Sequence, residues 1–288
     1  MAALQEFATK EKPQWCPGCG DYGILTGIKS ALSELDLERK DTVIVSGIGC
    51  SSKIPHYINT YGYEGIHGRP LPLASAIKMA NRRLTVVAMG GDGDGYGEGV
   101  QHFIHIARRN YDLTYIVHNN EIYGLTTGQA SPTTKKGMKT KSTPFGSIEV
   151  QFNPIANAIV NGATFVSRTF AGDPVHMKSI MKQAIEHKGF ALVDVFQPCV
   201  TFNKHNSYQW FKERIYDLQQ AGYTPKDKMK ALEIAYEDQK TNYAKVPVGV
   251  FYKELRPTYD DQLPQMKGKE LVDSSLDVDI TELCEELK

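Results

Sequence analysis

The sequence predicts an α/β fold, an open and mostly parallel β-sheet with helices on both faces, followed by a C-terminal arm. Five short apolar runs have the length and β-branched composition of buried strands, and amphipathic stretches of helical period lie between them. These runs are residues 42–45, 85–89, 113–117, 164–169 and 191–196. A strand–helix–strand order makes neighbouring strands parallel, so their carboxyl ends meet at one edge of the sheet.

Helices are predicted where apolar residues recur at intervals of three and four. The pattern is clear in residues 174–187, where Val175, Ile180, Met181 and Ala184 share one face. The same spacing predicts further helices at residues 22–35, 74–81, 100–107 and 155–160.

Three stretches lack such periodicity. Residues 51–73 are rich in Gly, Tyr and His, and we expect an irregular segment that carries site residues. Residues 123–146 are expected to form a long loop, either functional or mobile. In residues 224–288 charge rises and apolar periodicity weakens. We therefore expect an α/β domain over residues 1–223 and an extension or interface tail over residues 224–288.

The lysines of the long loop have two interpretations. They could meet phosphates or a partner's carboxylates, but a solvated charge run is favoured. They are Lys135, Lys136, Lys139 and Lys141.

Composition is typical of a cytoplasmic enzyme. The 288 residues are 41% hydrophobic, enough for one large core. Lys plus Arg and Asp plus Glu each number 33, so no basic surface for nucleic acid is indicated. No apolar run is long enough to span a membrane, and the N-terminal residues do not have a signal-peptide pattern. Five cysteines in a chain of this length do not form a disulfide framework.

Polar residues follow two of the predicted strands. Gly91-Asp92-Gly93-Asp94-Gly95 follows residues 85–89, and Asn119-Asn120 follows residues 113–117. A glycine-rich turn that opens a helix lets backbone amides approach a phosphate. Asp92 and Asn120 offer the oxygen ligands that Mg²⁺ prefers. Alone, the Gly/Asp cluster could be a tight turn, but the pair of clusters resembles the thiamine diphosphate motif.

Four cysteines form a second pattern. Cys16 and Cys19 lie in Trp-Cys-Pro-Gly-Cys-Gly, whereas Cys50 and Cys199 follow predicted strands. Four thiolates suit either a [4Fe–4S] cluster or a structural zinc, and unliganded core cysteines are a third possibility. A redox dithiol is disfavoured because no strand precedes Cys16. Cys284 is expected to be a free thiol without a role.

These motifs together resemble the β subunit of 2-oxoacid:ferredoxin oxidoreductases, from about residue 15 to residue 217. Besides the motifs above, the resemblance rests on Gly47-Ile48-Gly49-Cys50-Ser51, His67-Gly68-Arg69, Arg108-Arg109-Asn110, Asn119-Asn120-Glu121-Ile122-Tyr123-Gly124 and Gly128-Gln129-Ala130-Ser131-Pro132-Thr133. One departure is Ser51-Ser52-Lys53, where family members often carry Ser-Gly after the cysteine.

The resemblance implies a thiamine diphosphate-binding fold and a set of ligands. Cys16, Cys19, Cys50 and Cys199 would hold one [4Fe–4S] cluster, and Asp92, Asn120 and the carbonyl of Ile122 would bind Mg²⁺ with the diphosphate. The residues expected to line the cofactor are Gly49, Cys50, Ser51, His67, Gly68, Gly91, Gly93, Asp94, Gly124 and Leu125.

Three further residues are candidate catalytic groups near this site. Lys53 and Arg69 could meet the diphosphate or the substrate carboxylate, although they could equally be exposed or paired cations at the surface. His67 is the third candidate catalytic residue. His102 and His105, on the predicted crossover helix, are expected to be structural.

The implied activity is oxidative decarboxylation of a 2-oxoacid with coenzyme A, giving acyl-CoA and CO₂ and passing electrons through the cluster to ferredoxin. The same site could also run as CO₂ fixation. Residues 59–63 favour 2-oxoglutarate over pyruvate. Because only the diphosphate-binding half is found, we expect dependence on an α subunit, in an (αβ)₂ assembly.

Two other interpretations stay open. One is a non-redox thiamine diphosphate decarboxylase or ligase-type subunit with a structural zinc. The other is a non-catalytic homologue that retains the fold. Such a protein would have no physical need for Asp92, Asn120 and the four cysteines, so their presence argues against this interpretation.

Overall fold

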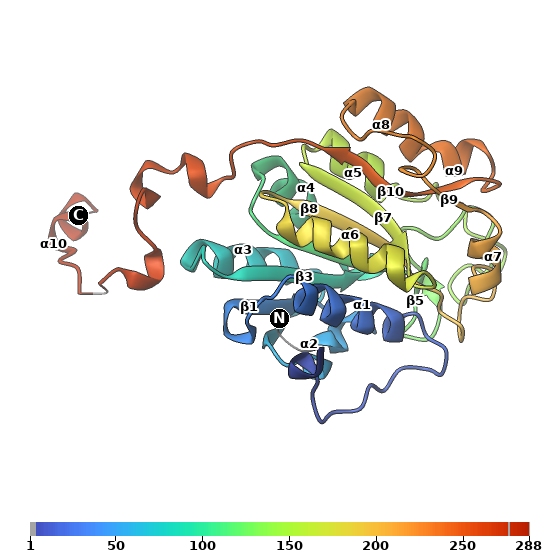
Figure 1. Ribbon diagram of the computed structural model, residues 1–288, viewed down its shortest axis with the longest axis horizontal. Helices are drawn as coiled ribbons and strands as arrows, with labels where there is room; N and C mark the ends of the chain where they lie inside the picture. Colours follow the sequence, from blue (N-terminus) through green and yellow to red (C-terminus); the bar gives the residue numbers. More distant parts are fainter. Residues whose placement is uncertain (1–3, 276, 288) are drawn as a thin grey trace.

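The computed structural model describes residues 4–275 and 277–287, and its main feature is an eight-stranded sheet (Figure 1). The strand order is β2-β1-β3-β4-β8-β7-β10-β9. The first six strands pair in parallel, whereas β10 runs antiparallel to β7 and parallel to β9. The strands are β1 (Thr42–Ser46), β2 (Tyr61–Glu64), β3 (Thr85–Gly91), β4 (Thr114–Asn119), β7 (Phe165–Phe170), β8 (Ala191–Phe196), β9 (Ile215–Asp217) and β10 (Val246–Lys253). A separate hairpin joins β5 (Ile122–Tyr123) to β6 (Gln129–Ala130).

Helices cover both faces of the sheet (Figure 1). On one face lie α1 (Asp21–Glu34), α2 (Ile54–Tyr57) and α6 (Pro174–Glu186). On the other lie α3 (Pro70–Ala80), α4 (Val100–Arg109), α5 (Pro154–Val160) and α8 (Lys228–Ala235). Because side chains alternate along a strand, Val43 and Val45 pack towards the second group and Ile44 towards the first. This arrangement confirms the predicted α/β fold.

The predicted elements of the sheet agree with the structure to within a few residues. The five predicted strands correspond to β1, β3, β4, β7 and β8. The predicted helices correspond to α1, α3, α4, α5 and α6. Helix α3 starts at Pro70 rather than at residue 74, because proline fits the first turn of a helix, where its missing N–H has no intrahelical partner anyway.

Among the described residues, five strands were not predicted, namely β2, β5, β6, β9 and β10. Residues 51–73, expected to be irregular, contain α2 and the edge strand β2, whose Tyr-Gly-Tyr-Glu sequence is exposed along its whole length. Strand β10 is the larger difference. Its residues are buried apart from Lys253, but Pro247 and Gly249 interrupt the usual strand pattern. Gly249 has a φ of +112°, which a residue with a side chain rarely adopts.

Strand β10 changes the expected domain limits. It lies inside the main sheet between β7 and β9, and α8 packs on it. The division expected at residue 223 therefore falls within the sheet-forming part of the chain, because residues 246–253 complete the sheet. The short helices α7 (Tyr208–Lys212) and α9 (Glu237–Lys240) belong to the same region.

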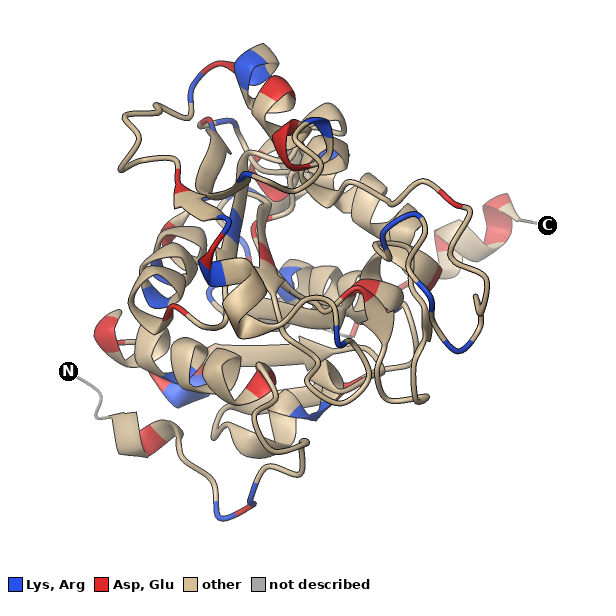
Figure 2. Cartoon of the chain, turned by 90° about the vertical axis from the view of Figure 1, so that its right-hand side faces the viewer, with Lys and Arg blue, Asp and Glu red and all other residues tan. Residues whose placement is uncertain are grey.

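After β10 the chain becomes an arm that ends in α10 (Thr281–Glu286), away from the sheet (Figure 1). In the cartoon of Figure 2, the positions of Lys and Arg are interspersed with those of Asp and Glu along the chain, in keeping with its balanced charge. Among the described residues, no helix is long and apolar enough to cross a membrane.

Candidate active site

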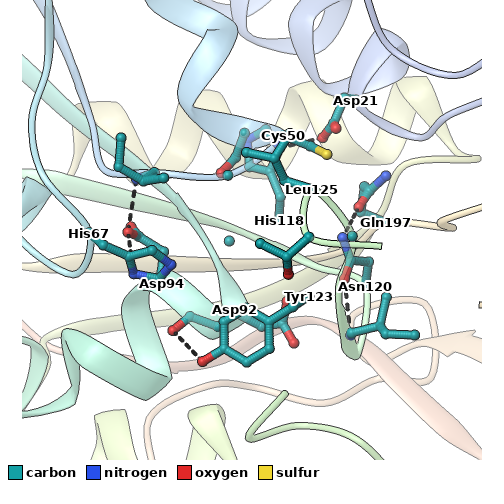
Figure 3. Close-up of a pocket in the computed structure, with 18 residues that line it drawn as sticks. Asp21, Cys50, His67, Asp92, Asp94, His118, Asn120, Tyr123, Leu125 and Gln197 are labelled. Atoms are coloured by element: carbon teal, nitrogen blue, oxygen red, sulfur yellow. Dashed lines mark hydrogen bonds and ion pairs between the residues drawn. The ribbon is translucent and has the colours of Figure 1, made fainter. Parts of the chain in front are cut away.

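A cavity lies at the carboxyl edge of the sheet, beyond the ends of β1, β3, β4 and β8 (Figure 3). Open parallel sheets bind ligands at this edge. Asp92, Asn120 and Ile122 line the cavity, together with most of the residues expected to meet the cofactor. These are Gly49, Cys50, Ser51, His67, Gly91, Gly93, Asp94, Gly124 and Leu125. Of that set only Gly68 does not line the cavity, although its amide supports the site.

Asp92 follows β3 directly and is almost fully buried. Its Oδ2 accepts hydrogen bonds from Ser131 Oγ at 2.5 Å and from Thr133 Oγ1 at 2.6 Å. Burial nevertheless raises the pKa of Asp92 to about 6, because removal from water penalises the charged form. A cation bound next to the Asp92 carboxylate would stabilise its negative charge, as water does for an exposed carboxylate.

Asn120 and Ile122 occupy the turn after β4. Glu121 between them has a φ of +59°, and the amide of Ile122 donates to Asn120 Oδ1 at 3.0 Å. Asn120 Nδ2 donates to Gln197 Oε1 at 2.8 Å. Because Oδ1 has two lone pairs and the Ile122 amide uses one of them, the other remains for a ligand. One carboxylate, one amide oxygen and one backbone carbonyl are the hard oxygen donors that suit Mg²⁺.

Asp94 joins three segments around the cavity. Its Oδ1 accepts from the amides of Gly68 at 2.7 Å and Ile48 at 2.9 Å, and His67 Nδ1 lies 3.4 Å away. A side chain at Gly47 would meet the Asp94 carboxylate, since its Cβ would lie 2.0 Å from Oδ2. Glycine at position 47 is therefore required by close approach. Burial raises the pKa of Asp94.

The Gly-rich turn itself forms one wide helical turn, Gly93–Glu98, of the π type, ahead of α4. Such turns often occur at functional sites. A Cβ at Gly93 would lie 2.2 Å from Cε1 of Tyr123, so glycine allows the Tyr123 ring to pack over the turn. Gly93 and Asp94, at the start of this segment, line the cavity, where glycine lets the backbone approach a phosphate.

A buried His–Asp pair also lines the cavity (Figure 3). His118 Nδ1 lies 2.6 Å from Asp21 Oδ1, and both side chains are almost inaccessible to solvent. His118 Nε2 is buried and has no hydrogen-bond partner among the described residues. A buried polar atom without a partner is costly, so this nitrogen fits a ligand in the cavity.

Sequence reasoning did not select Asp21, His118 or Gln197. His118 lies one residue before Asn119-Asn120, and Gln197 lies two residues before Cys199. Their position at or near strand ends was the available signal for His118 and Gln197. The partners of these side chains, however, come from segments that are distant in the sequence.

The four candidate cluster cysteines line a second cavity, next to the first. Cys16 and Cys19 come from the segment before α1, Cys50 from the turn after β1 and Cys199 from the turn after β8. Burial raises the pKa of Cys50 to about 12 and also raises that of Cys199. Both thiols are therefore expected to ionise only when a metal centre binds them.

The four thiols line one cavity. Across residues 4–275 and 277–287, no three His, Cys, Asp or Glu side chains converge as the ligands of a single metal ion would. A tetrahedral zinc needs its sulfurs about 2.3 Å from one ion. A cluster is larger than one ion and suits a more open set of thiols.

The candidate catalytic cations differ in position. His67 lines the first cavity, with Nδ1 3.2 Å from Glu98 Oε2. Lys53 lines the cysteine cavity, and its Nζ donates to the carbonyl of Gln14 at 3.5 Å. Arg69 does not line either cavity, and its Nη1 donates to the carbonyl of Glu98 at 3.1 Å.

Known proteins share both the sequence and the fold. Residues 47–195 match the family model for the C-terminal, thiamine pyrophosphate-binding domain of thiamine pyrophosphate enzymes. Residues 199–268 match the C-terminal model of the pyruvate ferredoxin oxidoreductase β subunit. The chain belongs to the β subunits of 2-oxoacid:ferredoxin oxidoreductases. It is an oxidoreductase subunit of a thiamine diphosphate-dependent family.

Individual relatives agree with this assignment. The chain is 44% identical over 278 residues to the β subunit of 2-oxoacid:ferredoxin oxidoreductase 1 of Aeropyrum pernix, covering 94% of this chain and 87% of that protein. It is 47% identical over 263 residues to the corresponding β subunit of Saccharolobus solfataricus, covering 87% and 85%. A solved 2-oxoglutarate:ferredoxin oxidoreductase from Magnetococcus marinus, with 2-oxoglutarate, coenzyme A and succinyl-CoA bound, has a TM-score of 0.90 at 35% identity, covering 100% of this chain and 96% of that one.

Proposed function

We propose that this subunit, together with an α subunit, oxidises a 2-oxoacid with coenzyme A to an acyl-CoA and CO₂ and passes the electrons to ferredoxin. We propose 2-oxoglutarate as the preferred substrate over pyruvate, supported by the ligands named for the Magnetococcus marinus enzyme. The observation that carries the proposal is the adjacency of two cavities, one lined by Asp92 and Asn120 and the other by four cysteines.

The residues of the first cavity fit thiamine diphosphate with Mg²⁺. Asp92, Asn120 and the Ile122 carbonyl would hold the ion, and the glycine-rich turn would present amides to the diphosphate. Bound thiamine diphosphate supplies the electron sink that lets a 2-oxoacid lose CO₂. Asp94 keeps three cavity segments together through the amides of Ile48 and Gly68, so the cofactor meets a preformed site.

The residues of the second cavity fit a [4Fe–4S] cluster better than zinc. Cys16, Cys19, Cys50 and Cys199 line one cavity without converging on a single point. A cluster there would lie one side-chain layer from the cofactor, because Cys50, Asn120, Gly124, Leu125 and Gln197 line both cavities. The electrons released on decarboxylation would therefore have a short route to an iron–sulfur acceptor.

Lys53 and His67 are proposed to act on the substrate. Lys53 adds positive charge beside the Cys50 wall, where it favours the thiolate, and it could meet a substrate carboxylate. His67 lines the cofactor cavity next to Asp94 (Figure 3). Arg69 is proposed to support the turn through its bond to the Glu98 carbonyl rather than to meet substrate in this arrangement.

The test is anaerobic co-expression with the α subunit, followed by iron, sulfide and zinc analysis and a 2-oxoacid panel assayed with coenzyme A and a viologen dye. We expect about four irons and four sulfides per αβ pair, since one cluster has four thiolate ligands here. Dye reduction should require coenzyme A and be fastest with 2-oxoglutarate. Zinc without iron, or CO₂ release without dye reduction, would instead indicate a non-redox thiamine diphosphate decarboxylase.

Assembly and direction can be tested with the same preparation. The β chain alone should not decarboxylate a 2-oxoacid, because the half-site for the pyrimidine ring is expected on the α subunit. Scattering mass should correspond to (αβ)₂. Reduced ferredoxin, CO₂ and an acyl-CoA should yield 2-oxoacid if the reaction is reversible.

A further inference from the structure

One glutamine lies in the wall between the two cavities. Gln197, directly after β8, lines both of them and is only 1% exposed. On one side, Gln197 contacts Asn120, a proposed metal ligand (Figure 3). On the other side, it contacts Cys19, a proposed cluster ligand.

Both ends of the Gln197 amide are used. Its Oε1 accepts from Asn120 Nδ2 at 2.8 Å, and its Nε2 donates to Cys19 Sγ at 3.1 Å. The same Nε2 lies 3.3 Å from the Pro198 carbonyl. An amide has one accepting end and one donating end, so these partners fix its orientation. The bond from Asn120 Nδ2 in turn directs the Asn120 oxygen away from Gln197.

The surroundings hold this amide in place. The Gln197 backbone amide donates to the Asn119 carbonyl at 2.9 Å, which ties it to the end of β4. A Cβ at Gly20 would lie 2.8 Å from Gln197 Cγ. The last glycine of the Cys-Pro-Gly-Cys-Gly motif therefore leaves the space that Gln197 occupies.

The contacts continue beyond Cys19. Its Sγ lies 3.4 Å from Asp21 Oδ2, and Asp21 pairs with His118, whose free Nε2 faces the first cavity. A hydrogen-bonded path thus runs from Asn120 through Gln197 to Cys19, and the Asp21–His118 pair lies next to its Cys19 end.

We propose that Gln197 is a positioning residue that couples the two centres, an inference that rests on the proposed function. Its carbonyl oxygen orients the Asn120 amide so that the Asn120 oxygen can bind the metal ion. Its N–H donates to the Cys19 sulfur. One-electron reduction adds a negative charge to a cluster, and an N–H donor to a ligating sulfur stabilises that charge. Gln197 therefore raises the reduction potential of the cluster and tightens cofactor binding.

The experiment compares Gln197→Met and Gln197→Glu in the co-expressed αβ complex. Methionine has a similar length but neither an amide donor nor a strong acceptor, so both bonds are lost. We expect a lower cluster midpoint potential and a 10–100-fold weaker binding of thiamine diphosphate with Mg²⁺, the usual effect of removing a group that orients a metal ligand. In a titration run at a pH high enough to ionise the buried carboxyl group, glutamate keeps an acceptor for Asn120 but has no N–H for Cys19. It should lower the potential while leaving cofactor binding within about threefold of the wild type.

The matched control is Gln219→Met. Gln219 also uses both ends of its amide, donating to the Val250 carbonyl and accepting from the Val250 amide, each at 2.9 Å, but it lies at β10 and lines neither cavity. It should change neither the potential nor the cofactor affinity.

Potentials would be measured by electron paramagnetic resonance-monitored titration, and affinities by calorimetry of the cofactor-depleted complex. Wild-type values for both Gln197 variants would overturn the inference, and if Gln197→Met does not fold, Gln197→Glu decides through the potential. A wild-type complex without iron or without thiamine diphosphate binding would instead refute the proposed function.

Discussion

Asp92 shows how single residues prepare this site for a cation. Two hydroxyl donors hold its carboxylate, yet burial still raises its pKa to about 6. The two hydroxyls thus do not fully replace the water that burial removed. Thr133 has a second role, because its Oγ1 also lies 2.9 Å from Asn119 Oδ1, so its single O–H is shared between the two acceptors. The hydroxyl therefore fixes the ends of β3 and β4 relative to one another.

We predict that Thr133→Val weakens binding of Mg²⁺ with thiamine diphosphate by about 10–100-fold, because Asp92 loses a group that orients it. Valine keeps the shape of threonine and removes only the hydroxyl. Calorimetric titration of the cofactor-depleted αβ complex measures the effect. Thr143→Val is the control, since the Thr143 hydroxyl bonds to Thr140 and Met138 in the same loop and not to Asp92. Equal affinities in the two variants would exclude this role for Thr133.

Residues at strand ends could be predicted from the sequence, whereas residues that act through pairing could not. Asp92, Asn120 and Cys50 follow apolar runs, and parallel strands bring their ends to one edge. Gln197 and the Asp21–His118 pair depend on contacts between residues 77 to 178 positions apart. No local pattern encodes such contacts.

At the scale of elements, the long loop after β6 is anchored by a lysine. Lys135 Nζ lies 3.8 Å from the centre of the Trp210 ring and 4.4 Å from that of Tyr243. It donates to Asn206 Oδ1 at 2.8 Å and lies 3.5 Å from Glu121 Oε2. Burial lowers the pKa of Lys135. The expectation of a solvated charge run is therefore wrong for Lys135, whereas Lys136, Lys139 and Lys141 are exposed.

We predict that Lys135→Met destabilises the chain by about 3 kcal/mol, because it leaves the buried Glu121 carboxylate without its cation. Methionine still fills the space between the aromatic rings, so lost packing contributes little. Urea unfolding followed by far-ultraviolet circular dichroism gives the free energy of unfolding. Lys136→Met, at an exposed neighbour, should change it by less than about 0.5 kcal/mol. A similarly small change for Lys135→Met would show that the loop does not depend on this anchor.

The prediction of strands failed where the sequence lacks the usual apolar, β-branched pattern, for example where glycine or proline interrupts it. Tyr61–Glu64 forms β2 although every side chain is exposed, because its backbone pairs with β1. Val246–Lys253 forms β10 with Pro247 and Gly249 inside it, and the register shifts between Val250 and Tyr252. Pairing with distant β7 outweighs the weak local preference there.

At the scale of the whole molecule, Arg82 makes several of the contacts between the sheet domain and the arm. Arg82 Nη2 donates to the carbonyls of Met266 and Lys269, each at 2.9 Å, and to Glu270 Oε1 at 3.0 Å. Arg83 reaches the arm too, through Asp273, but both side chains of that pair are more than half exposed. Exposed pairs contribute little to stability, so the Arg83 pair should hold this part of the arm less firmly than Arg82 does. Nearer to β10, the arm is also held by Asn110, whose Nδ2 donates to the carbonyls of Arg256 and Pro257.

We predict that Arg82→Met releases the arm from the body without unfolding the sheet. Four hydrogen bonds from a mostly buried guanidinium are lost. Two backbone carbonyls lose this donor, and the Glu270 carboxylate keeps only the bond from the Arg82 backbone amide among these contacts. Limited proteolysis should then cut between β10 and α10 at least several-fold faster, whereas the midpoint of thermal unfolding should fall by only a few degrees. Arg83→Met, which removes a solvent-exposed ion pair, should leave the cleavage rate near that of the wild type. Equal cleavage rates for Arg82→Met and Arg83→Met would mean that other contacts hold the arm, such as the bond from Arg256 to the Gly162 carbonyl.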